Sequence, residues 1–232
     1  MQALILAAGK GTRIGIKDTP KCLLKIGNTT IIEFQINCFR NIGCDKILVV
    51  TGYNSNKILE RLGSSVEYIF NENFEHSNNL YSLGEALRVI DDEFICVYGD
   101  LLFHKNILEK CNASTKEITL VVERNLRDET MRVKIENQKI VQVNKNIDDK
   151  NSDGNFIGMK KFSKNIKDSL HKNIKELIEK GNYDAYYTLA LENMIKQGQP
   201  IHFIETSGYP WMDIDTKEEL EEAKKIEREF VG

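Results

Sequence analysis

An apolar strand that runs straight into a glycine-rich loop is the feature that most constrains the fold of this chain. The predicted strand Gln2–Ala7 is followed by Ala8-Gly9-Lys10-Gly11-Thr12-Arg13, and Pro20-Lys21 comes a few residues later. Small residues leave the backbone bare, so its N–H groups can close on phosphate oxygens. Arg13 offers a forked set of donors and Lys21 a point charge, the two kinds of cation that bind polyphosphates. The loop therefore predicts a nucleoside triphosphate site at the end of the first strand.

Two other phosphate-binding motifs fit this loop less well. A dinucleotide fingerprint would need a third glycine where Ile14 stands and an acidic residue at the end of a second strand near Val50. A P-loop would end in Gly-Lys-Ser or Gly-Lys-Thr, which the loop lacks. A tight turn without a ligand explains the glycines, but it gives no reason for Arg13 and Lys21 beside them.

Length and composition are typical of one compact enzyme domain. The 232 residues suit a single domain, 1–232, and 29% charged with 41% hydrophobic residues excludes a disordered or membrane-embedded chain. No apolar run approaches a membrane span and no signal sequence is recognised, so we expect a cytoplasmic protein without membrane contact. The net charge of -3 argues against nucleic acid as a partner. Five cysteines without C-x-x-C spacing and four scattered histidines do not form the pattern of a zinc site.

Strands and helices alternate over the first hundred residues. Strands are expected at Gln2–Ala7, Lys46–Thr51, Val66–Phe70 and Phe94–Tyr98, and helices at Thr30–Ile42, Asn56–Leu62 and about Leu80–Val89. This alternation predicts an α/β fold with a mostly parallel central sheet and helices on both faces. Ligands then bind at the carboxyl ends of the strands.

The pattern changes after Asp100. Strands are expected at Glu117–Arg124, Met131–Glu136 and Lys139–Val143, followed by a polar loop at Asn144–Asn155. We expect residues 116–155 to form a small β-arm insertion, which could be a lid over the active site or a contact in a homodimer. Later elements are helices at Ser163–Glu179 and Asp184–Lys196, a strand at Ile201–Glu205, and a helix from Thr216 to about Glu229 that starts with a Thr216/Glu219 capping box.

Three aspartates are candidate ligands of a divalent metal. Asp100 follows an apolar strand, where the sheet opens toward a ligand. Asp213 and Asp215 alternate along an extended segment before a helix, so they share one face. Mg²⁺ prefers oxygen ligands and bridges them to phosphates. The alternatives are a turn aspartate at Asp100 and a solvated helix start at Asp213 and Asp215.

The loop L-A-A-G-x-G-T-R with the following P-K resembles, residue for residue, the signature of the nucleotidyltransferase (nucleotide pyrophosphorylase-like) family. The segment 14–18 lacks the proline-rich continuation of many sugar-phosphate members. The resemblance implies a Rossmann-like nucleotidyltransferase fold and Mg²⁺ as cofactor. It places metal-binding carboxylates at Asp100 and Asp215, with Asp213 as an additional candidate.

A second resemblance involves the segment Ser77-Asn78-Asn79-Leu80-Tyr81-Ser82-Leu83, which is similar to choline-phosphate type cytidylyltransferases. Three short polar residues before a helix also suit a plain N-cap. The resemblance implies nucleotide contacts from Leu6, Ala7, Ala8, Gly9, Lys10, Gly11, Thr12, Arg13, Asn79 and Ser82. It implies acceptor contacts from Ser77, Asn78, Asn79, Phe156, Asp184, Tyr186 and Trp211, whose carboxylate and rings suit a cationic or amino group.

These resemblances imply a cytidylyltransferase that transfers CMP from CTP to a small phosphorylated acceptor and releases pyrophosphate. Phosphocholine, 2-aminoethylphosphonate and phosphoglutamine are the candidate acceptors, in surface polysaccharide (capsule) or lipid modification. A phosphate acceptor needs no general base, because its second pKa is about 6. The catalytic residues would be Arg13 on the triphosphate, Lys21 on the α-phosphate and Asp100 on the metal. A sugar-1-phosphate nucleotidyltransferase using UTP, dTTP or GTP and an inactive nucleotide-binding regulator remain as alternatives.

Overall fold

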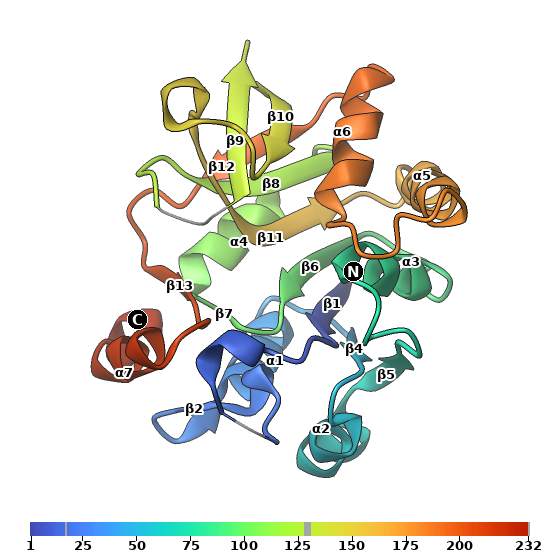
Figure 1. Ribbon diagram of the computed structural model, residues 1–232. Coiled ribbons are helices and arrows are strands. Elements are labelled where there is room, and N and C mark those ends of the chain that lie inside the picture. Colours follow the sequence, from blue (N-terminus) through green and yellow to red (C-terminus); the bar gives the residue numbers. More distant parts are fainter. Residues whose placement is uncertain (17, 128–130, 232) are drawn as a thin grey trace.

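Four parallel strands form one half of a large sheet in the computed structural model, which describes residues 1–16, 18–127 and 131–231 (Figure 1). Their order across the sheet is β5 (Glu67–Phe70), β4 (Lys46–Thr51), β1 (Gln2–Ala7) and β6 (Phe94–Tyr98). β1 pairs in parallel with both β4 and β6. A strand between two parallel neighbours is covered on both faces, which explains why β1 is apolar almost throughout.

The other half of the sheet is mixed. It contains β8 (Ile118–Glu123), β9 (Met131–Glu136), β10 (Lys139–Asn144), β11 (Gly154–Phe162) and β12 (His202–Glu205). β11 joins the two halves because it pairs antiparallel with β8 along one edge and with β6 and β9 along the other. The predicted loop Asn144–Asn155 is wrong at its end, since Gly154 and Asn155 already belong to β11.

Helices cover both faces of the sheet, so the predicted α/β fold is confirmed. One face carries α1 (Ile31–Asn41), α2 (Ser55–Leu62) and α4 (Lys105–Ala113), and the other α3 (Asn79–Leu87), α5 (Lys167–Glu179) and α6 (Thr188–Lys196). β1 contributes Ile5 to the first core and Leu6 to the second, as the alternation of strand side chains requires. No helix of the described residues is both long and apolar enough to cross a bilayer.

The expected insertion at 116–155 is divided between two places. Its first strand, β8, lies inside the large sheet, where it pairs with β11 and β12. β9 and β10 form an antiparallel hairpin at the end of the sheet (Figure 1). Residues 128–130 of this segment lie outside the described part of the chain. The hairpin ends beside the carboxyl end of the central strands, because Lys145, directly after β10, lines the cavity found there.

A small two-stranded sheet brings the C-terminal segment back to the central strands. β13 (Trp211–Asp213) pairs antiparallel with β7 (Leu101–Phe103), and the Ile214 N–H donates to the Asp100 carbonyl at 3.0 Å. The following α7 (Lys217–Lys225) starts with the predicted Thr216/Glu219 capping box. It ends at Lys225, before the predicted Glu229, and a short α8 (Glu227–Val231) follows. This arrangement carries the late aspartates to the end of β6.

One pair of very short strands and two helical turns complete this part of the N-terminal region. β2 (Lys25–Ile26) pairs with β3 (Thr29–Thr30), and η1 (Thr12–Ile14) and η2 (Lys21–Leu23) lie in the loop after β1. β7 and α4 were not predicted from the sequence. The loop after β1 therefore folds into two turns, which direct its cations toward the sheet.

Candidate active site

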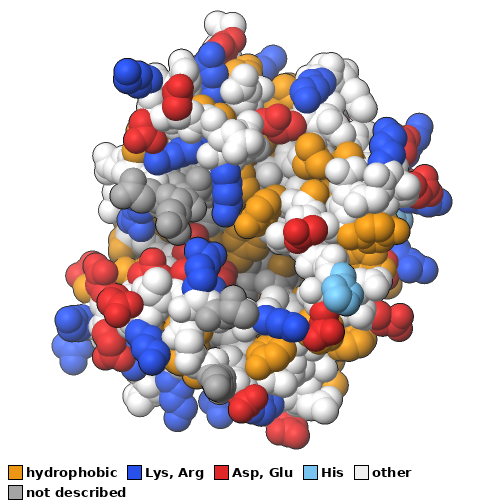
Figure 2. All heavy atoms as spheres, viewed as in Figure 1, with side chains coloured by type: hydrophobic (Ala, Val, Ile, Leu, Met, Phe, Trp, Pro, Cys, Tyr) orange, Lys and Arg blue, Asp and Glu red, His pale blue; other side chains and the backbone are white. Residues whose placement is uncertain are grey.

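A cavity of about 650 Å³ opens at the carboxyl ends of β1 and β6. It appears as a hollow near the middle of the face that Figure 2 presents. The predicted site residues that line it are Leu6, Ala7, Ala8, Gly9, Gly11, Arg13, Lys21, Ser77, Asn78, Asn79, Ser82, Asp100, Phe156, Tyr186, Asp213 and Asp215. Segments that lie up to two hundred residues apart in the sequence thus meet in one site, as expected for ligands of an α/β sheet.

The loop after β1 presents bare backbone to the cavity. A Cβ at Gly9 would meet no atom within 4 Å, so this stretch faces open space. Gly11 has a φ of +59°, and a Cβ there would lie 2.6 Å from Cγ of Lys21. Glycine is required at that position both by the backbone conformation and by the lysine stem that packs against it. The loop can therefore approach a phosphate group closely while it holds Lys21 in place.

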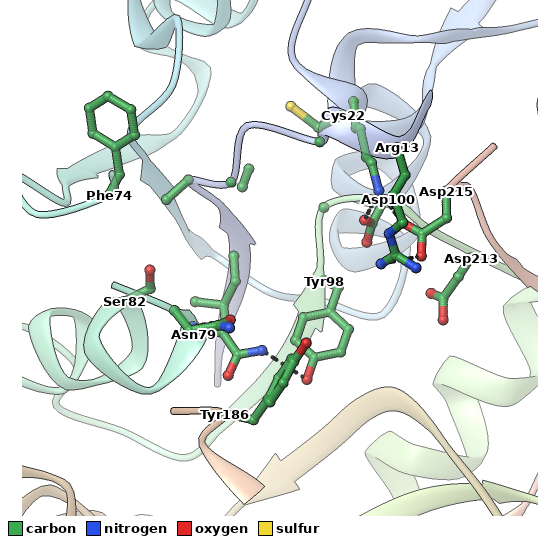
Figure 3. Close-up of a pocket in the computed structure, with 18 of the residues that line it drawn as sticks. Arg13, Cys22, Phe74, Asn79, Ser82, Tyr98, Asp100, Tyr186, Asp213 and Asp215 are labelled. Carbon is green, nitrogen blue, oxygen red and sulfur yellow. Dashed lines mark hydrogen bonds and ion pairs between the residues drawn. The ribbon is translucent and has the colours of Figure 1, made fainter. Parts of the chain in front are cut away.

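Two cations and two carboxylates form an ion-pair cluster on the side of the cavity next to this loop (Figure 3). Lys21, with a side chain only 12% exposed, places Nζ 3.3 Å from Oδ2 of Asp100 and pairs with Asp215 as well. A guanidinium nitrogen of Arg13 lies 2.7 Å from the other carboxylate oxygen of Asp215. Burial lowers the pKa of Lys21, but the two carboxylates outweigh it and raise the pKa overall. Lys21 is therefore an ammonium ion at neutral pH.

Asp100 is held in a corner between β6 and β7. The side-chain amide of Gln35, fully buried on α1, donates to the carbonyls of Tyr98 at 2.8 Å and Leu101 at 2.7 Å. These two bonds fix the backbone on either side of Asp100. Burial and the nearby Asp215 raise the pKa of Asp100, against the lowering effect of Lys21. Keeping the Asp100 carboxylate ionised in this buried corner costs free energy, and a further cation next to it would reduce that cost.

Asp213 is a third carboxylate beside this cluster, and no cation of the described residues forms an ion pair with it. Its Oδ1 is buried and has no hydrogen-bond partner there. Burial, followed by the charges of Asp100 and Asp215, raises the pKa of Asp213 well above its ordinary value. An unpaired carboxylate oxygen next to two others is the donor set that Mg²⁺ prefers. In the described residues, however, no three acidic, histidine or cysteine side chains are arranged around one metal position, and Lys21 bridges Asp100 and Asp215 instead.

The opposite side of the cavity is polar and neutral. The Asn71 side-chain amide donates to the hydroxyls of Ser77 at 3.1 Å and Ser82 at 3.0 Å. Asn79 donates to the Tyr98 hydroxyl at 3.2 Å, the contact drawn in Figure 3, while its side-chain oxygen accepts from the Tyr187 N–H at 2.8 Å. The N-cap interpretation also holds, because Asn78 is the N-cap of α3.

Three predicted site residues do not line the cavity. Lys10 is exposed and pairs with Glu75 at 2.8 Å. The prediction for Thr12 concerns a side chain outside those that the structure describes. Asp184 is exposed, since α6 starts at Thr188 and not at Asp184 as predicted. Trp211 is 3% exposed, and its indole N–H donates to a Glu123 carboxylate oxygen at 3.4 Å within the core. The structure thus places Asp184 and Trp211 outside the lining of this cavity.

Sequence reasoning missed several residues of the cavity, among them Phe74 and three that bear on the acceptor or base. Asn71 directly follows β5, so the rule that ligands bind at carboxyl ends of strands could have found it. Tyr98 precedes Asp100 and was treated only as part of its strand. Lys145 lies in the segment predicted as a polar loop; its Nζ donates to the Tyr186 hydroxyl at 3.1 Å and lies 4.6 Å from the centre of that ring. No local pattern distinguishes Lys145 from other surface lysines.

Gly158→Ala should destabilise the protein much more than Gly181→Ala. Both glycines have φ near +90°, which costs a non-glycine residue about 1 to 2 kcal/mol. A Cβ at Gly158 would also lie 2.4 Å from the Tyr98 ring, whereas one at Gly181 would meet nothing within 4 Å. We expect Gly158→Ala to lower the free energy of unfolding, measured by urea denaturation, by about 2 to 5 kcal/mol. Equal losses for both variants would contradict this packing of Tyr98.

Known proteins share this sequence and architecture. A CTP:phosphoglutamine cytidylyltransferase from Campylobacter jejuni is 26% identical over 251 residues, covering 95% of this chain and 98% of that protein. A bifunctional IPC transferase and DIPP synthase from Aquifex aeolicus is 30% identical over 233 residues, covering 96% of this chain and 51% of that protein. The chain thus spans about half the length of the second relative.

The fold has close counterparts too. The structure of a CTP:phosphocholine cytidylyltransferase from Streptococcus pneumoniae superposes with a TM-score of 0.81 over 97% of this chain and 98% of that one, at 23% identity. The family model of the MobA-like NTP transferase domain matches residues 3–203, which run from β1 into β12 and include the glycine-rich loop, Lys21 and Asp100. The resemblance to nucleotidyltransferases seen in the sequence is confirmed, and the chain belongs to the family of MobA-like NTP transferase domains.

Proposed function

We propose that this protein is a cytidylyltransferase that transfers CMP from CTP to a small phosphorylated acceptor and releases pyrophosphate. The observation that carries the proposal is the cluster of Arg13 and Lys21 with Asp100 and Asp215 beside the bare loop after β1. Its cations suit a triphosphate, and its carboxylates suit the metal that accompanies one. The names of two similar proteins, which use CTP, support cytosine as the base.

The triphosphate would lie along the loop, where backbone N–H groups and Arg13 can bind its oxygens. Arg13 is already directed toward the cavity by Asp215. Lys21, between Asp100 and Asp215, is placed to meet negative charge at the α-phosphorus and the incoming oxygen. Such preorganised charges stabilise a transition state without reorganising at the moment of reaction. The incoming phosphate oxygen is ionised at neutral pH, so no general base is needed.

Magnesium fits the donor chemistry of this site. Asp100, Asp213 and Asp215 would hold it, with the buried unpaired Oδ1 of Asp213 as the oxygen that most needs a cation. Bound Mg²⁺ would supply neutralisation of the triphosphate charge. Lys21 would then share Asp100 and Asp215 with the metal. The position of the Lys21 side chain would therefore depend on metal binding.

The acceptor would bind on the side of the cavity away from the loop, between Asn79, Tyr98 and Tyr186. Lys145 is a cation on that side and lies at the cavity wall. It is therefore available to the acceptor phosphate, opposite Lys21. The base would lie near Ala8 and Ser82, where the Asn71 amide fixes the Ser82 hydroxyl.

A pyrophosphate-release assay over a panel of nucleotides and acceptors tests the proposal. We expect Mg²⁺-dependent release with CTP, and lower efficiency with UTP, because uracil presents an acceptor where cytosine presents an amino donor. Comparable efficiency with CTP and UTP, or a preference for UTP, dTTP or GTP with glucose-1-phosphate, would favour a sugar-1-phosphate nucleotidyltransferase. Binding of CTP without release from any acceptor would favour an inactive regulator.

A further inference from the structure

Lysine side chains already lie over most of the aromatic rings that line the cavity. Nζ of Lys160 is 4.6 Å from the centre of the Tyr98 ring, and Nζ of Lys145 is 4.6 Å from that of Tyr186. A third lysine, Lys10, lies 6.0 Å from the ring of Phe74 near the loop after β1. Rings of this kind form boxes for quaternary ammonium groups only when their faces are accessible to the ligand.

Lys160 is the unusual member of this set. It lies on β11, its side chain has no exposed surface, and it does not line the cavity, so it approaches Tyr98 from the protein interior. Its Nζ is also 4.0 Å from the Tyr187 ring and donates to the Gly158 carbonyl at 3.4 Å. No carboxylate of the described residues forms an ion pair with it within 4.0 Å. Burial lowers the pKa of Lys160 against the opposing effect of the nearby Cys96, while the two ring faces and the Gly158 carbonyl lie where they stabilise an ammonium ion.

A ring that binds a cation on one face is a poor site for a second cation on the other. The electron density that attracts the ligand is already polarised toward Lys160, and the two positive charges repel each other across the ring. The same holds at Tyr186, whose ring and hydroxyl both contact Lys145. Tyr98 and Tyr186 therefore each have a lysine charge against the ring, so the acceptor side of the cavity lies close to two positive charges.

The carboxylates of the cavity do not offset this potential. The acidic side chains among its described lining residues are Asp100, Asp213, Asp215 and Glu219. Asp100 and Asp215 pair with Lys21, Asp213 would be neutralised by the Mg²⁺ proposed above, and Glu219 is engaged in the capping box of α7. Asp184, predicted to attract a cationic acceptor, lies outside the cavity. Glu192 is also occupied, since its carboxylate accepts from the Val143 N–H and the Asn144 amide.

We propose that Lys160 is a specificity-determining residue, which selects phosphate or phosphonate acceptors whose remaining part carries no uncompensated positive charge. This rests on the proposed function and replaces the expectation of a cationic acceptor. Lys160 acts through Tyr98, whose ring transmits its charge to the cavity, and Lys145 adds a second positive charge at the opposite wall. A neutral or anionic acceptor body gains from both lysines, whereas a quaternary ammonium is repelled by both.

The test compares two acceptors of nearly identical shape, phosphocholine and 3,3-dimethylbutyl phosphate, in which carbon replaces the quaternary nitrogen. Binding is measured by isothermal titration calorimetry with and without α,β-methylene-CTP, so that no turnover is required. We expect the wild-type protein to bind the neutral compound about tenfold more tightly. In Lys160→Met, a neutral variant of similar length, this preference should fall to about one.

Lys161→Met is the matched control, because Lys161 is the next residue on β11, is also buried, and instead donates to the carbonyls of Asn112 and Ser114 and pairs with Glu93 at 3.3 Å. It should keep the wild-type preference. If Lys160→Met does not fold, Lys145→Met takes its place in the test. It changes an exposed residue of the cavity wall, so the fold should be retained, and the preference for the neutral compound should decrease. Tighter or equal binding of phosphocholine by the wild type, no measurable binding of either compound, or an unchanged preference in a folded Lys160→Met would overturn the proposal.

The outcome is separable from that of the proposed function. A protein that prefers the neutral compound in calorimetry but releases no pyrophosphate with CTP would retain this selection and lose the transferase assignment. A protein that releases pyrophosphate but prefers phosphocholine would retain the transferase assignment and lose this selection.

Discussion

Asp215→Asn should lower the turnover number for pyrophosphate release by about 10² to 10³. Asp215 pairs with both cations of the cluster, through one oxygen to Arg13 at 2.7 Å and through the other to Lys21. The neutral amide loses both ion pairs and removes a charge that would bind Mg²⁺. The turnover number is measured at saturating CTP, acceptor and Mg²⁺.

Asp184→Asn is the control for this substitution, because Asp184 is an exposed aspartate that does not line the cavity. It should retain the wild-type rate. A turnover number for Asp215→Asn within a few-fold of wild type, with the fold intact by circular dichroism, would show that the cluster does not take part in the reaction.

Lys21→Met should reduce the turnover number by a similar factor, about 10² or more. The loss should appear in the turnover number more than in the KM for CTP, since Lys21 is placed to meet charge that increases in the transition state. The variant also leaves Asp100 and Asp215 without the ammonium that bridges them. The melting temperature of the variant should therefore fall. Added Mg²⁺ should reverse part of this decrease, because it supplies the missing positive charge.

The exposed Lys25, four residues further on in β2, provides a matched control. Lys25→Met should change neither rate nor melting temperature appreciably. If Lys21→Met altered only the affinity for nucleotide, Lys21 would be a binding residue without a catalytic role.

The parallel half of the fold could be predicted because its signals are local. β1 and β4 are short apolar runs that occur exactly where the alternating pattern placed them, and the Thr216/Glu219 capping box defines the start of α7. β11 could not be found in this way. It carries two lysines and two glycines within nine residues, so it lacks both the apolar run and the alternation of a typical strand. Its burial depends on tertiary contacts that satisfy Lys160 and Lys161 individually.

The same distinction applies to the site. Arg13, Lys21 and Asp100 were predictable because their neighbours form recognisable motifs and because strand ends converge in an α/β sheet. The acceptor side was predicted less well. A tryptophan and an aspartate in the sequence suggested a cation site, but Trp211 packs in the core and the exposed Asp184 lies outside the cavity. By our proposal, the charge of that side depends on Lys160, a buried residue that does not line the cavity itself and acts through Tyr98.

Transfer of an isotopic label tests the central claim most directly. CTP labelled with ³²P at the α-phosphorus is incubated with the protein, Mg²⁺ and a phosphorylated acceptor, and the products are separated by ion-exchange chromatography. Attack at the α-phosphorus should place the label in a CMP–acceptor conjugate, while CTP labelled at the γ-phosphorus should place it in pyrophosphate. Label that stays in CTP with every acceptor, or that leaves as free CMP or orthophosphate, would contradict the proposed transfer.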